Sequence, residues 1–137
     1  YPMGEFKIND TRVIYAKQGV SFLSIAQQYN IPLARLFEFN ELQQAETVAE
    51  DQLIFLQRKR KTGQGEYYKV QPGETLYVIA QQEGIRLESL CELNLLHPDE
   101  RPAPGERLSL HKKATIRPKL LLREQYSLYS PNNRLNN

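Results

Sequence analysis

The stretch Ile25-Ala26-Gln27-Gln28 occurs again 54 residues later as Ile79-Ala80-Gln81-Gln82. At this shift, residues 13–56 align with residues 67–110 without a gap, and 14 of the 44 compared positions are identical. Self-similarity at one fixed shift indicates that a structural unit is used twice. We therefore predict two copies of one small module in this chain of 137 residues.

The first copy begins with a β-branched and aromatic run, residues 13–16, which predicts a strand. Gly19 follows in a turn, and Ser21 is suited to the N-cap of a first helix. Asn30 can take the left-handed conformation that ends such a helix. The corresponding features of the second copy are residues 67–70, Gly73, Thr75 and Gly84.

A second short helix is predicted over residues 33–40 in the first copy and 87–94 in the second. Closing strands are predicted at residues 53–56 and 107–110. The result is an α+β fold of two βααβ modules, each with two helices on one face of a two-stranded antiparallel sheet. Most positions that the copies share carry Ile, Leu or Ala, and we expect these to form the cores.

The chain divides into five predicted segments. Residues 1–11 lead in with a hairpin around Asn9-Asp10, residues 12–57 and 66–111 are the modules, and residues 58–65 and 112–137 form a basic linker and a basic tail. The linker run Arg58-Lys59-Arg60-Lys61 precedes Thr62-Gly63-Gln64-Gly65, a composition that predicts flexibility. The tail either packs on a module as an extra strand or is partly disordered.

Charge is distributed unevenly along the chain. The net charge is +2, but the linker contributes four positive charges and the tail a net five, which leaves the modules acidic at −7. We therefore expect no nucleic acid partner for the modules. No run approaches the roughly 18 apolar residues of a membrane span.

The residues that carry chemistry in other proteins are sparse. Cys91 is the only cysteine, so the chain has no internal disulfide and no Cys-rich zinc site. His97 and His111 do not form a ligand spacing with Cys91. Glu38 and Glu92 occupy equivalent positions but have no acidic partner, which favours a solvated helix face over a glycosidase pair. We expect no cofactor, no metal and no catalysis in this segment.

The second copy contains Tyr67-Tyr68-Lys69-Val70-Gln71-Pro72-Gly73-Glu74-Thr75-Leu76-Tyr77-Val78-Ile79-Ala80, then Asn94, then Pro104-Gly105-Glu106-Arg107-Leu108. It resembles the LysM domain, whose pattern is a strand, Pro-Gly-Asp/Glu-Thr-Leu, Ile-Ala, a second helix ending in Asn, and Pro-Gly before the last strand. The first copy departs from this pattern. It has Gln18-Gly19-Val20-Ser21 in place of Pro-Gly-Glu-Thr and Glu50-Asp51 in place of Pro-Gly. The resemblance covers roughly residues 12–111.

This resemblance implies a shallow groove that binds polymers containing N-acetylglucosamine, namely peptidoglycan and chitin. Two loops would form its walls, one after the first strand and one before the last. Carried over by position, the second groove would use Gly73, Glu74, Thr75, Leu76 and Tyr77, facing Pro102, Ala103, Pro104 and Gly105. Weaker candidates in the first module are Gly19, Val20, Ser21, Phe22 and Leu23, facing Val48, Ala49, Glu50 and Asp51.

We therefore expect a non-catalytic carbohydrate-binding tandem that recognises peptidoglycan or chito-oligosaccharides and gains affinity by avidity. Paired modules after a lead-in hairpin are similar in arrangement to the C-terminal part of Bacteroidetes-type cell-wall glucosaminidases. The resemblance implies an attached catalytic domain and a location in the cell envelope, periplasmic, at the outer surface or secreted. Two alternatives stay open: a structural or protein-interaction tandem that positions a neighbouring domain, and polyanion binding by the linker and tail.

Overall fold

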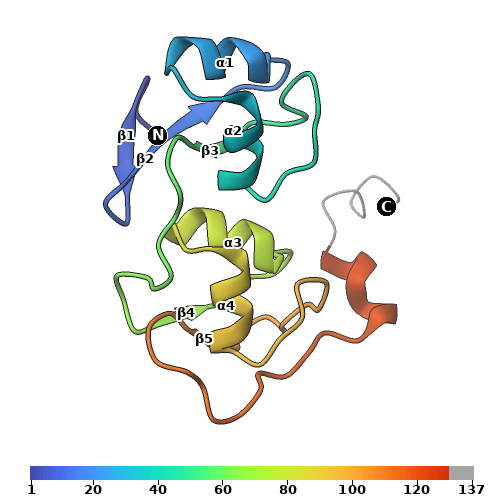
Figure 1. Cartoon of the computed structure of the whole chain (residues 1–137). Coiled ribbons are helices and arrows are strands. Elements are labelled where there is room, and N and C mark those ends of the chain that lie inside the picture. Colours follow the sequence, from blue (N-terminus) through green and yellow to red (C-terminus); the bar gives the residue numbers. More distant parts are fainter. Residues whose placement is uncertain (130–137) are drawn as a thin grey trace.

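The computed structural model describes residues 1–129 and shows two modules, one above the other in Figure 1. Every helix among these residues is too short or too polar to span a lipid bilayer. The predicted tail extends to residue 137, and its last eight residues, 130–137, lie outside the described part. The first module contains β1 (Phe6–Ile8), β2 (Thr11–Ala16), α1 (Phe22–Gln28), α2 (Leu33–Phe39) and β3 (Gln52–Phe55). The second contains β4 (Tyr67–Lys69), α3 (Leu76–Glu83), α4 (Leu87–Leu93) and β5 (Arg107–Ser109), and a 3₁₀ helix, η1 (Arg123–Tyr129), follows.

The strand pairing confirms the predicted βααβ order in both modules. β2 pairs antiparallel with β3, and β4 pairs antiparallel with β5. Ile14 lies opposite Ile54 and Tyr68 opposite Leu108, which is the same register displaced by 54 residues. The sheet of the first module has a third strand, because β1 adds to β2 and gives the order β1-β2-β3.

The predicted helix ends form as the residue types suggest. The Ser24 N–H donates to Ser21 Oγ, and the Val78 N–H donates to Thr75 Oγ1, each at 3.2 Å. Such caps stabilise a helix by about 1 kcal/mol. Asn30 and Gly84 follow the first helices with φ of 55° and 66°, in the left-handed region.

One asparagine at the end of each second helix joins that helix to the closing strand. Asn40 Nδ2 donates to the carbonyls of Leu36 and Phe55, and its Oδ1 accepts from the Phe55 N–H. Asn94 makes the same three bonds with Leu90 and Ser109. Both amides are buried, at 0% and 1% exposure. The asparagine of the repeat is therefore a structural residue in both copies.

Each module has its own apolar core between its helices and its sheet. The repeated Ile, Leu and Ala positions supply both cores, as the sequence predicts. The first core contains Ile14, Ala16, Phe22, Ile25, Ala26, Leu36, Phe37, Val48, Ile54 and Leu56. The second contains Val70, Leu76, Ile79, Ala80, Ile85, Leu90, Cys91, Leu96, Leu108 and Leu110.

The opposite face of the first sheet carries a second, smaller apolar cluster formed by side chains of its own three strands. Asn9 and Asp10 form the turn of the hairpin of β1 and β2, with φ of 51° and 57°. Val13, Leu53 and Phe55 are buried on this face and pack against side chains of the hairpin. The first sheet therefore has apolar side chains on both faces.

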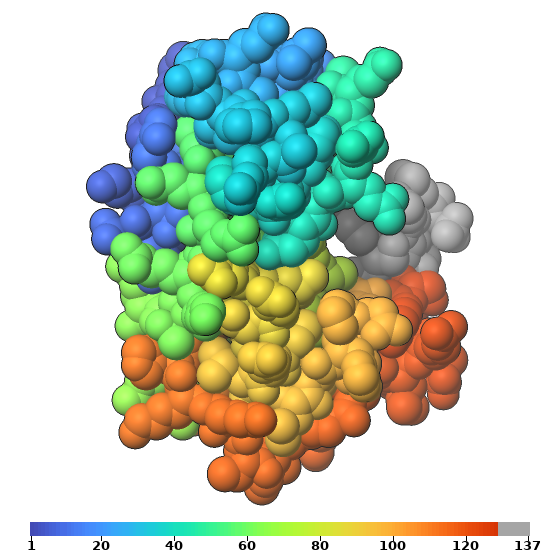
Figure 2. All heavy atoms as spheres, in the orientation of Figure 1, coloured from blue at the N-terminus to red at the C-terminus, as the bar shows by residue number. Residues whose placement is uncertain are grey.

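The linker is packed between the modules, whereas its composition predicts a flexible segment. Lys59 is 1% exposed, and its Nζ donates to Glu41 and to Gln81 Oε1. Gln81 Nε2 in turn donates to Asn40 Oδ1 and to the Leu53 carbonyl, both at 3.1 Å. Figure 2 shows the two modules in direct contact, with the linker at their junction. Buried hydrogen bonds therefore hold the linker in place.

A second set of contacts joins the turn of the hairpin to the second module. Asn9 Nδ2 donates to the carbonyls of Thr62 and Gly84, at 2.8 and 3.1 Å. The Arg60 guanidinium donates to the Asn9 carbonyl and pairs with Asp10. Arg60 and Ile85 form an isolated parallel bridge. These bonds cross from residues 9–10 to residues 60–85, so they hold the two modules in one arrangement.

The described part of the tail packs on the second module, but through an isolated bridge and not as the extra strand of the first alternative. Pro102 and Leu120 form an antiparallel bridge. The Ala103 N–H donates to the Lys119 carbonyl and the Leu121 N–H to the Arg101 carbonyl, each at 2.8 Å. Leu120 packs against the second core.

Candidate functional site

The first predicted wall of the second module is the turn between β4 and α3. Gly73 has a φ of 84°, a conformation that glycine adopts without strain. The Glu74 carboxylate accepts hydrogen bonds from the Tyr68 hydroxyl and from the Gln71 N–H at 2.8 Å. Burial raises the pKa of Tyr68, and the hydrogen bond to the Glu74 carboxylate raises it further. Glu74 therefore bonds back to the strand and the turn, and so fixes the shape of the loop.

The next residues of this wall begin the helix. Thr75 is the N-cap of α3, and Leu76 is a core residue at 1% exposure. A ligand on this loop would reach the backbone near Gly73 and Glu74, both half-buried. Phe22, the first-module counterpart of Leu76, is buried at 2% exposure. The structure thus places these two candidates beneath the walls and among the core residues.

The second wall, residues 102–105, lies between the first wall and the tail. Gly105 N–H donates to the Val70 carbonyl at 2.8 Å, which brings the bases of the two loops side by side. Pro102 is buried, Ala103 and Pro104 are half-buried, and Gly105 is exposed. Gly105 has a φ of 90°, and no atom lies within 4 Å of where a Cβ would stand.

The two modules differ in how their loops meet. In the first module the Gly19 N–H donates to the Val48 carbonyl and the Val48 N–H to the Val20 carbonyl, both at 2.8 Å. The Phe22 N–H donates to the Glu46 carbonyl at 3.0 Å. Among the described residues of the second module, no backbone hydrogen bond joins residues 71–76 to residues 99–104. Pro102 stands at the position of Val48 and has no N–H to donate.

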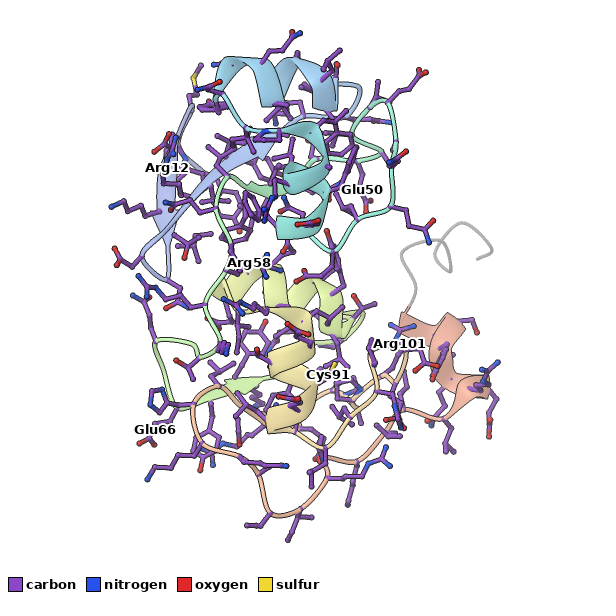
Figure 3. The ribbon with its side chains drawn as sticks, viewed as in Figure 1. Arg12, Glu50, Arg58, Glu66, Cys91 and Arg101 are labelled. Carbon is purple, nitrogen blue, oxygen red and sulfur yellow. The ribbon has the colours of Figure 1, made fainter. Side chains whose placement is uncertain are left out.

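The tail binds the outer edge of the second wall. Backbone groups of successive residues in an extended segment point to opposite sides. In the first module the even positions Glu46 and Val48 bond to the facing loop. In the second module the tail bonds to the odd positions Arg101 and Ala103, so the edge toward residues 71–76 is left unpaired. Figure 3 shows Glu50 and Arg101 on the corresponding loops of the two modules.

Tyr77 lies at the junction of the modules. A hollow of about 280 Å³, which we name the junction hollow, is lined by Tyr1, Tyr15 and residues 50–53 of the first module and by Tyr77, Val78, Gln81 and Gln82 of α3. The Tyr77 hydroxyl is buried and has no hydrogen-bond partner among the described residues. Burial raises the pKa of Tyr77 above its usual range. The structure therefore places Tyr77 with Glu50 and Asp51 in the lining of the junction hollow, which does not include Gly73.

The remaining candidates of the first module lie on its surface. Val20 is 37% exposed and Leu23 52% exposed. Asp51 accepts a hydrogen bond from the Gln18 N–H at 2.8 Å and pairs with Lys17 at 3.4 Å. The Gln18 hydrogen bond, with Lys17 adding to it, lowers the pKa of Asp51. Asp51 thus ties together the two loops that in the second module contain Pro72 and Gly105.

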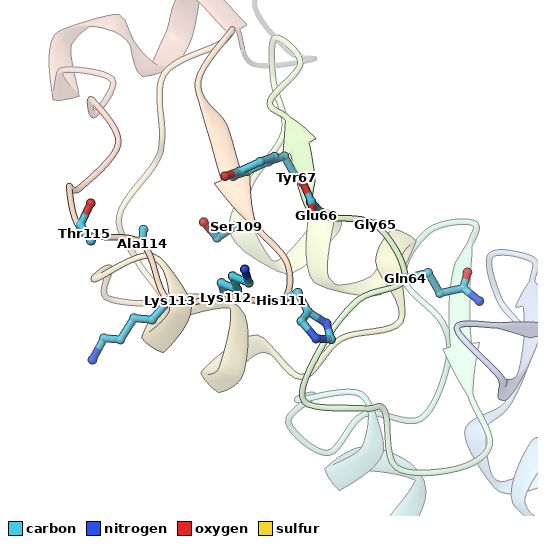
Figure 4. A pocket seen from close by; sticks show the side chains of 10 residues that line it. All are labelled: Gln64, Gly65, Glu66, Tyr67, Ser109, His111, Lys112, Lys113, Ala114 and Thr115. Atoms are coloured by element: carbon cyan, nitrogen blue, oxygen red, sulfur yellow. The ribbon is translucent and has the colours of Figure 1, made fainter.

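Within residues 1–129, the basic residues of the linker and those of the tail line separate hollows. Lys59 is buried, and Arg60 pairs with Asp10 at 2.8 Å. A separate hollow of about 580 Å³ lies between β4, β5 and the start of the tail (Figure 4). It is lined by Gln64, Gly65, Glu66, Tyr67, Ser109, His111, Lys112, Lys113, Ala114 and Thr115. Lys113 extends away from it in Figure 4, and Glu66 offsets Lys112, so the net charge there is small.

The groups considered for catalysis are scattered. Glu38 and Glu92 are exposed on separate helices, and Glu38 lies 3.7 Å from Arg35. Burial raises the pKa of the Cys91 thiol to about 11, which disfavours the nucleophilic thiolate. Among residues 1–129 no group of three or more His, Cys, Asp and Glu side chains is arranged to hold a metal ion.

Sequence reasoning missed the junction hollow and did not show that the tail would pack on the second wall. Both depend on contacts between segments more than 15 residues apart. The one local signal for the tail is Pro102, which cannot pair with Glu74 as Val48 pairs with Val20. The buried Lys59 gave no signal, because its neighbours in the sequence are exposed cations.

Comparison with known proteins identifies the repeat. The family model for the LysM domain matches residues 16–54 and again residues 68–110. No curated protein matches the chain. Among solved structures, the spore cortex-lytic enzyme SleL of Bacillus cereus is 29% identical over 74% of this chain, with a TM-score of 0.33, and SleL of Bacillus megaterium QM B1551 is 23% identical over 78%, with a TM-score of 0.32. The chain covers 23% and 22% of those two chains.

LysM domains are non-catalytic binding modules. They generally bind peptidoglycan and N-acetylglucosamine polymers, and they occur in extracellular or cell-wall proteins. The two matched ranges cover more than half of the residues, and each contains the βααβ order of elements described above. The chain therefore belongs to the LysM family and carries two LysM domains in tandem.

Proposed function

We propose that this tandem binds peptidoglycan through N-acetylglucosamine, and that the two loops of the second module form its main site. The observation that carries the proposal is the difference between the loop pairs. In the first module the backbone groups of the two loops bond to each other, whereas among the described residues of the second module those groups make no such bonds. An unpaired row of backbone donors and acceptors is what an N-acetyl amide can bind.

The side chains at these loops suit a neutral sugar. Gly73 and Gly105 expose backbone without a side chain in the way, and Ala103 and Pro104 offer small apolar contacts. Sites of this kind combine apolar walls with a few well-placed polar groups. Thr75 and Glu74 shape the loop through their own hydrogen bonds, so we assign them a positioning role.

The wider role that we propose is targeting. A non-catalytic domain contributes to cell-wall chemistry by holding an attached enzyme on its substrate. The paired modules resemble in arrangement the C-terminal part of cell-wall glucosaminidases, and this supports an attached hydrolase domain and a location in the cell envelope.

A second candidate function is a structural tandem that positions a neighbouring domain. It is favoured by the hydrogen-bonded loops of the first module and by the buried contacts across the junction. On this reading the first module serves as a rigid spacer, while the second binds little or no sugar.

Titration of the full chain with chito-oligosaccharides, followed by backbone amide NMR, separates the two functions. We expect shifts at the amides of Gly73, Glu74, Ala103 and Gly105, and smaller shifts at Gly19 and Val20. An absence of shifts at millimolar trisaccharide and hexasaccharide, together with no retention on insoluble peptidoglycan, would overturn the proposal and favour the structural role.

A further inference from the structure

The junction hollow is a feature of the tandem and not of either module alone. Its first wall comes from Tyr15 of β2 and residues 50–53 at the start of β3, and its second from α3. Binding pockets occur preferentially at interfaces between domains. Its volume of about 280 Å³ is near the lower end for small-molecule pockets, roughly 300 Å³, which suits a single sugar ring.

The hollow is held open by contacts that a ligand does not need to supply. Gln81, one of its lining residues, donates to Asn40 and to the Leu53 carbonyl, and it accepts from the buried Lys59. Asn40, Lys59 and Gln81 are at most 5% exposed. Because the bonds cross between the modules, the two walls keep their separation without ligand, and binding there does not bear the cost of ordering the junction.

Side chains at the rim have unused hydrogen-bonding capacity. The Glu50 carboxylate makes no hydrogen bond or ion pair within the described residues. Gln82 uses only its Oε1, which accepts from the Tyr68 hydroxyl at 3.1 Å, so its amide donors are available. The Tyr77 ring and the exposed Val78 add apolar surface, beside the Tyr15 ring that packs against Tyr1. Apolar ring faces with hydroxyl groups around the edge are the surface that a pyranose presents.

The charge of the hollow selects among cell-wall groups. Glu50 and Asp51 are the acids of its lining, and Lys17 pairs with Asp51 alone. The surplus negative charge disfavours the carboxylates of stem peptides and tolerates an uncharged sugar. An anionic ligand is therefore a poor match, and a glycan backbone is a good one.

The position of the hollow links it to both loop pairs. Glu50 and Asp51 belong to the second wall of the first module, and Tyr77 ends the segment Gly73–Tyr77 that begins the first wall of the second. We propose that the junction hollow binds one sugar residue of the same glycan chain that the second module binds. The tandem would then contact a longer stretch of glycan than one LysM domain does. The proposal rests on the proposed function of the second module.

The test compares short and long chito-oligosaccharides on the full chain by calorimetry. The variant combines Glu50→Ala with Gln82→Ala, both at exposed side chains. The matched control combines Glu92→Ala with Gln28→Ala, also exposed, where Gln28 is the first-module counterpart of Gln82. We expect the wild type and the control to bind an octasaccharide more tightly than a trisaccharide. The variant should lose about tenfold in octasaccharide affinity, the order expected for one or two hydrogen bonds, and keep its trisaccharide affinity.

The outcomes separate the two proposals. If the variant keeps the full gain from the trisaccharide to the octasaccharide, the junction site is wrong and the second-module site stands. An equal loss on both oligosaccharides would also overturn the junction site, because the variant would then act through the second module. Failure of the wild type to bind either oligosaccharide would overturn the proposed function and the junction site with it.

Discussion

The two modules share one backbone plan but use equivalent residues differently. Gln27 and Gln81 occupy the same position of the repeat, yet Gln27 is exposed whereas Gln81 is buried and bonds to Lys59, Asn40 and Leu53. Val48 pairs with the facing loop, while Pro102 pairs with the tail. Identical residues in the two copies therefore indicate the shared core. The contacts of a surface residue depend on which segments lie beside its own module.

Lys59 should give the largest effect on stability, because it joins the modules from a buried position. Lys59→Ala would leave Gln81 and the partly exposed Glu41 without their cation. The hydrogen bond lost at the buried Gln81 and the cavity left by the lysine side chain together cost about 3 kcal/mol. We expect urea unfolding to lose this amount and to split into two transitions as the modules uncouple. Lys61→Ala, at an exposed cation two residues away, is the control. Equal midpoints for the two variants would show that the linker does not couple the modules.

Asn94→Ala tests the helix-to-strand clamp in the copy where the clamp acts alone. The variant leaves the Ser109 N–H and two carbonyls without their side-chain partner. We expect a loss of about 2–3 kcal/mol in the unfolding free energy of the second module, since buried unpaired groups are costly. Asn40→Ala should in addition weaken the junction, because Asn40 Oδ1 also accepts from Gln81. Hydrogen exchange at the amides of residues 76–83 should distinguish Asn94→Ala from Asn40→Ala. Equal changes in exchange there would contradict an additional role of Asn40 at the junction.

Gly84→Ala tests whether the hairpin and the second module are in firm contact. At a φ of 66° a side chain adds strain, and its Cβ would stand 2.9 Å from the Asn9 Cβ and 3.1 Å from Ile8. We expect a loss of about 2 kcal/mol. Gly105→Ala has the backbone strain of a φ of 90° but no steric clash, because no atom lies within 4 Å of the added Cβ. It should cost about 1 kcal/mol of stability. Thermal unfolding measures the loss of stability in both variants. An equal loss would show that the hairpin moves to make room for the added Cβ.

Exchanging the residues that separate the loop pairs should change sugar binding by a smaller amount. Pro102→Val supplies an N–H that can donate to the Glu74 carbonyl, as Val48 donates to Val20. We expect the loops of the second module to pair and the affinity for a trisaccharide to fall about fivefold, close to 1 kcal/mol. Pro2→Val, at an exposed proline outside the loops of both modules, is the control for composition. Unchanged affinity in Pro102→Val would remove the loop difference as the basis of binding.

Much of the fold follows from local sequence. Repeated Ile, Leu and Ala at helical spacing define the cores, and Ser21, Thr75 and Gly84 mark helix ends through their own backbone chemistry. The candidate site follows less well. Leu76 and Phe22 fall in the cores because helix periodicity, and not loop position, governs them. Tyr77 and Lys59 depend on the other module, and contacts of that kind leave no periodic signal in either segment.

The smallest predicted effect concerns Asp51, where the first module uses a carboxylate at the position of Gly105. The Gln18 N–H holds the pKa of Asp51 below its ordinary value of about 3.9. A carboxylate with a lowered pKa in the folded state contributes stability that is present above the ordinary pKa and is lost as the pH falls through the folded value. The Gln18 amide shift should therefore titrate at a pH below 3.9, while the Gly105 amide should not follow that titration. Asp51→Asn should abolish the titration at Gln18 and leave the amides of the second module unchanged. A Gln18 amide that titrates at the ordinary pKa would show that Asp51 does not hold the two loops of the first module together.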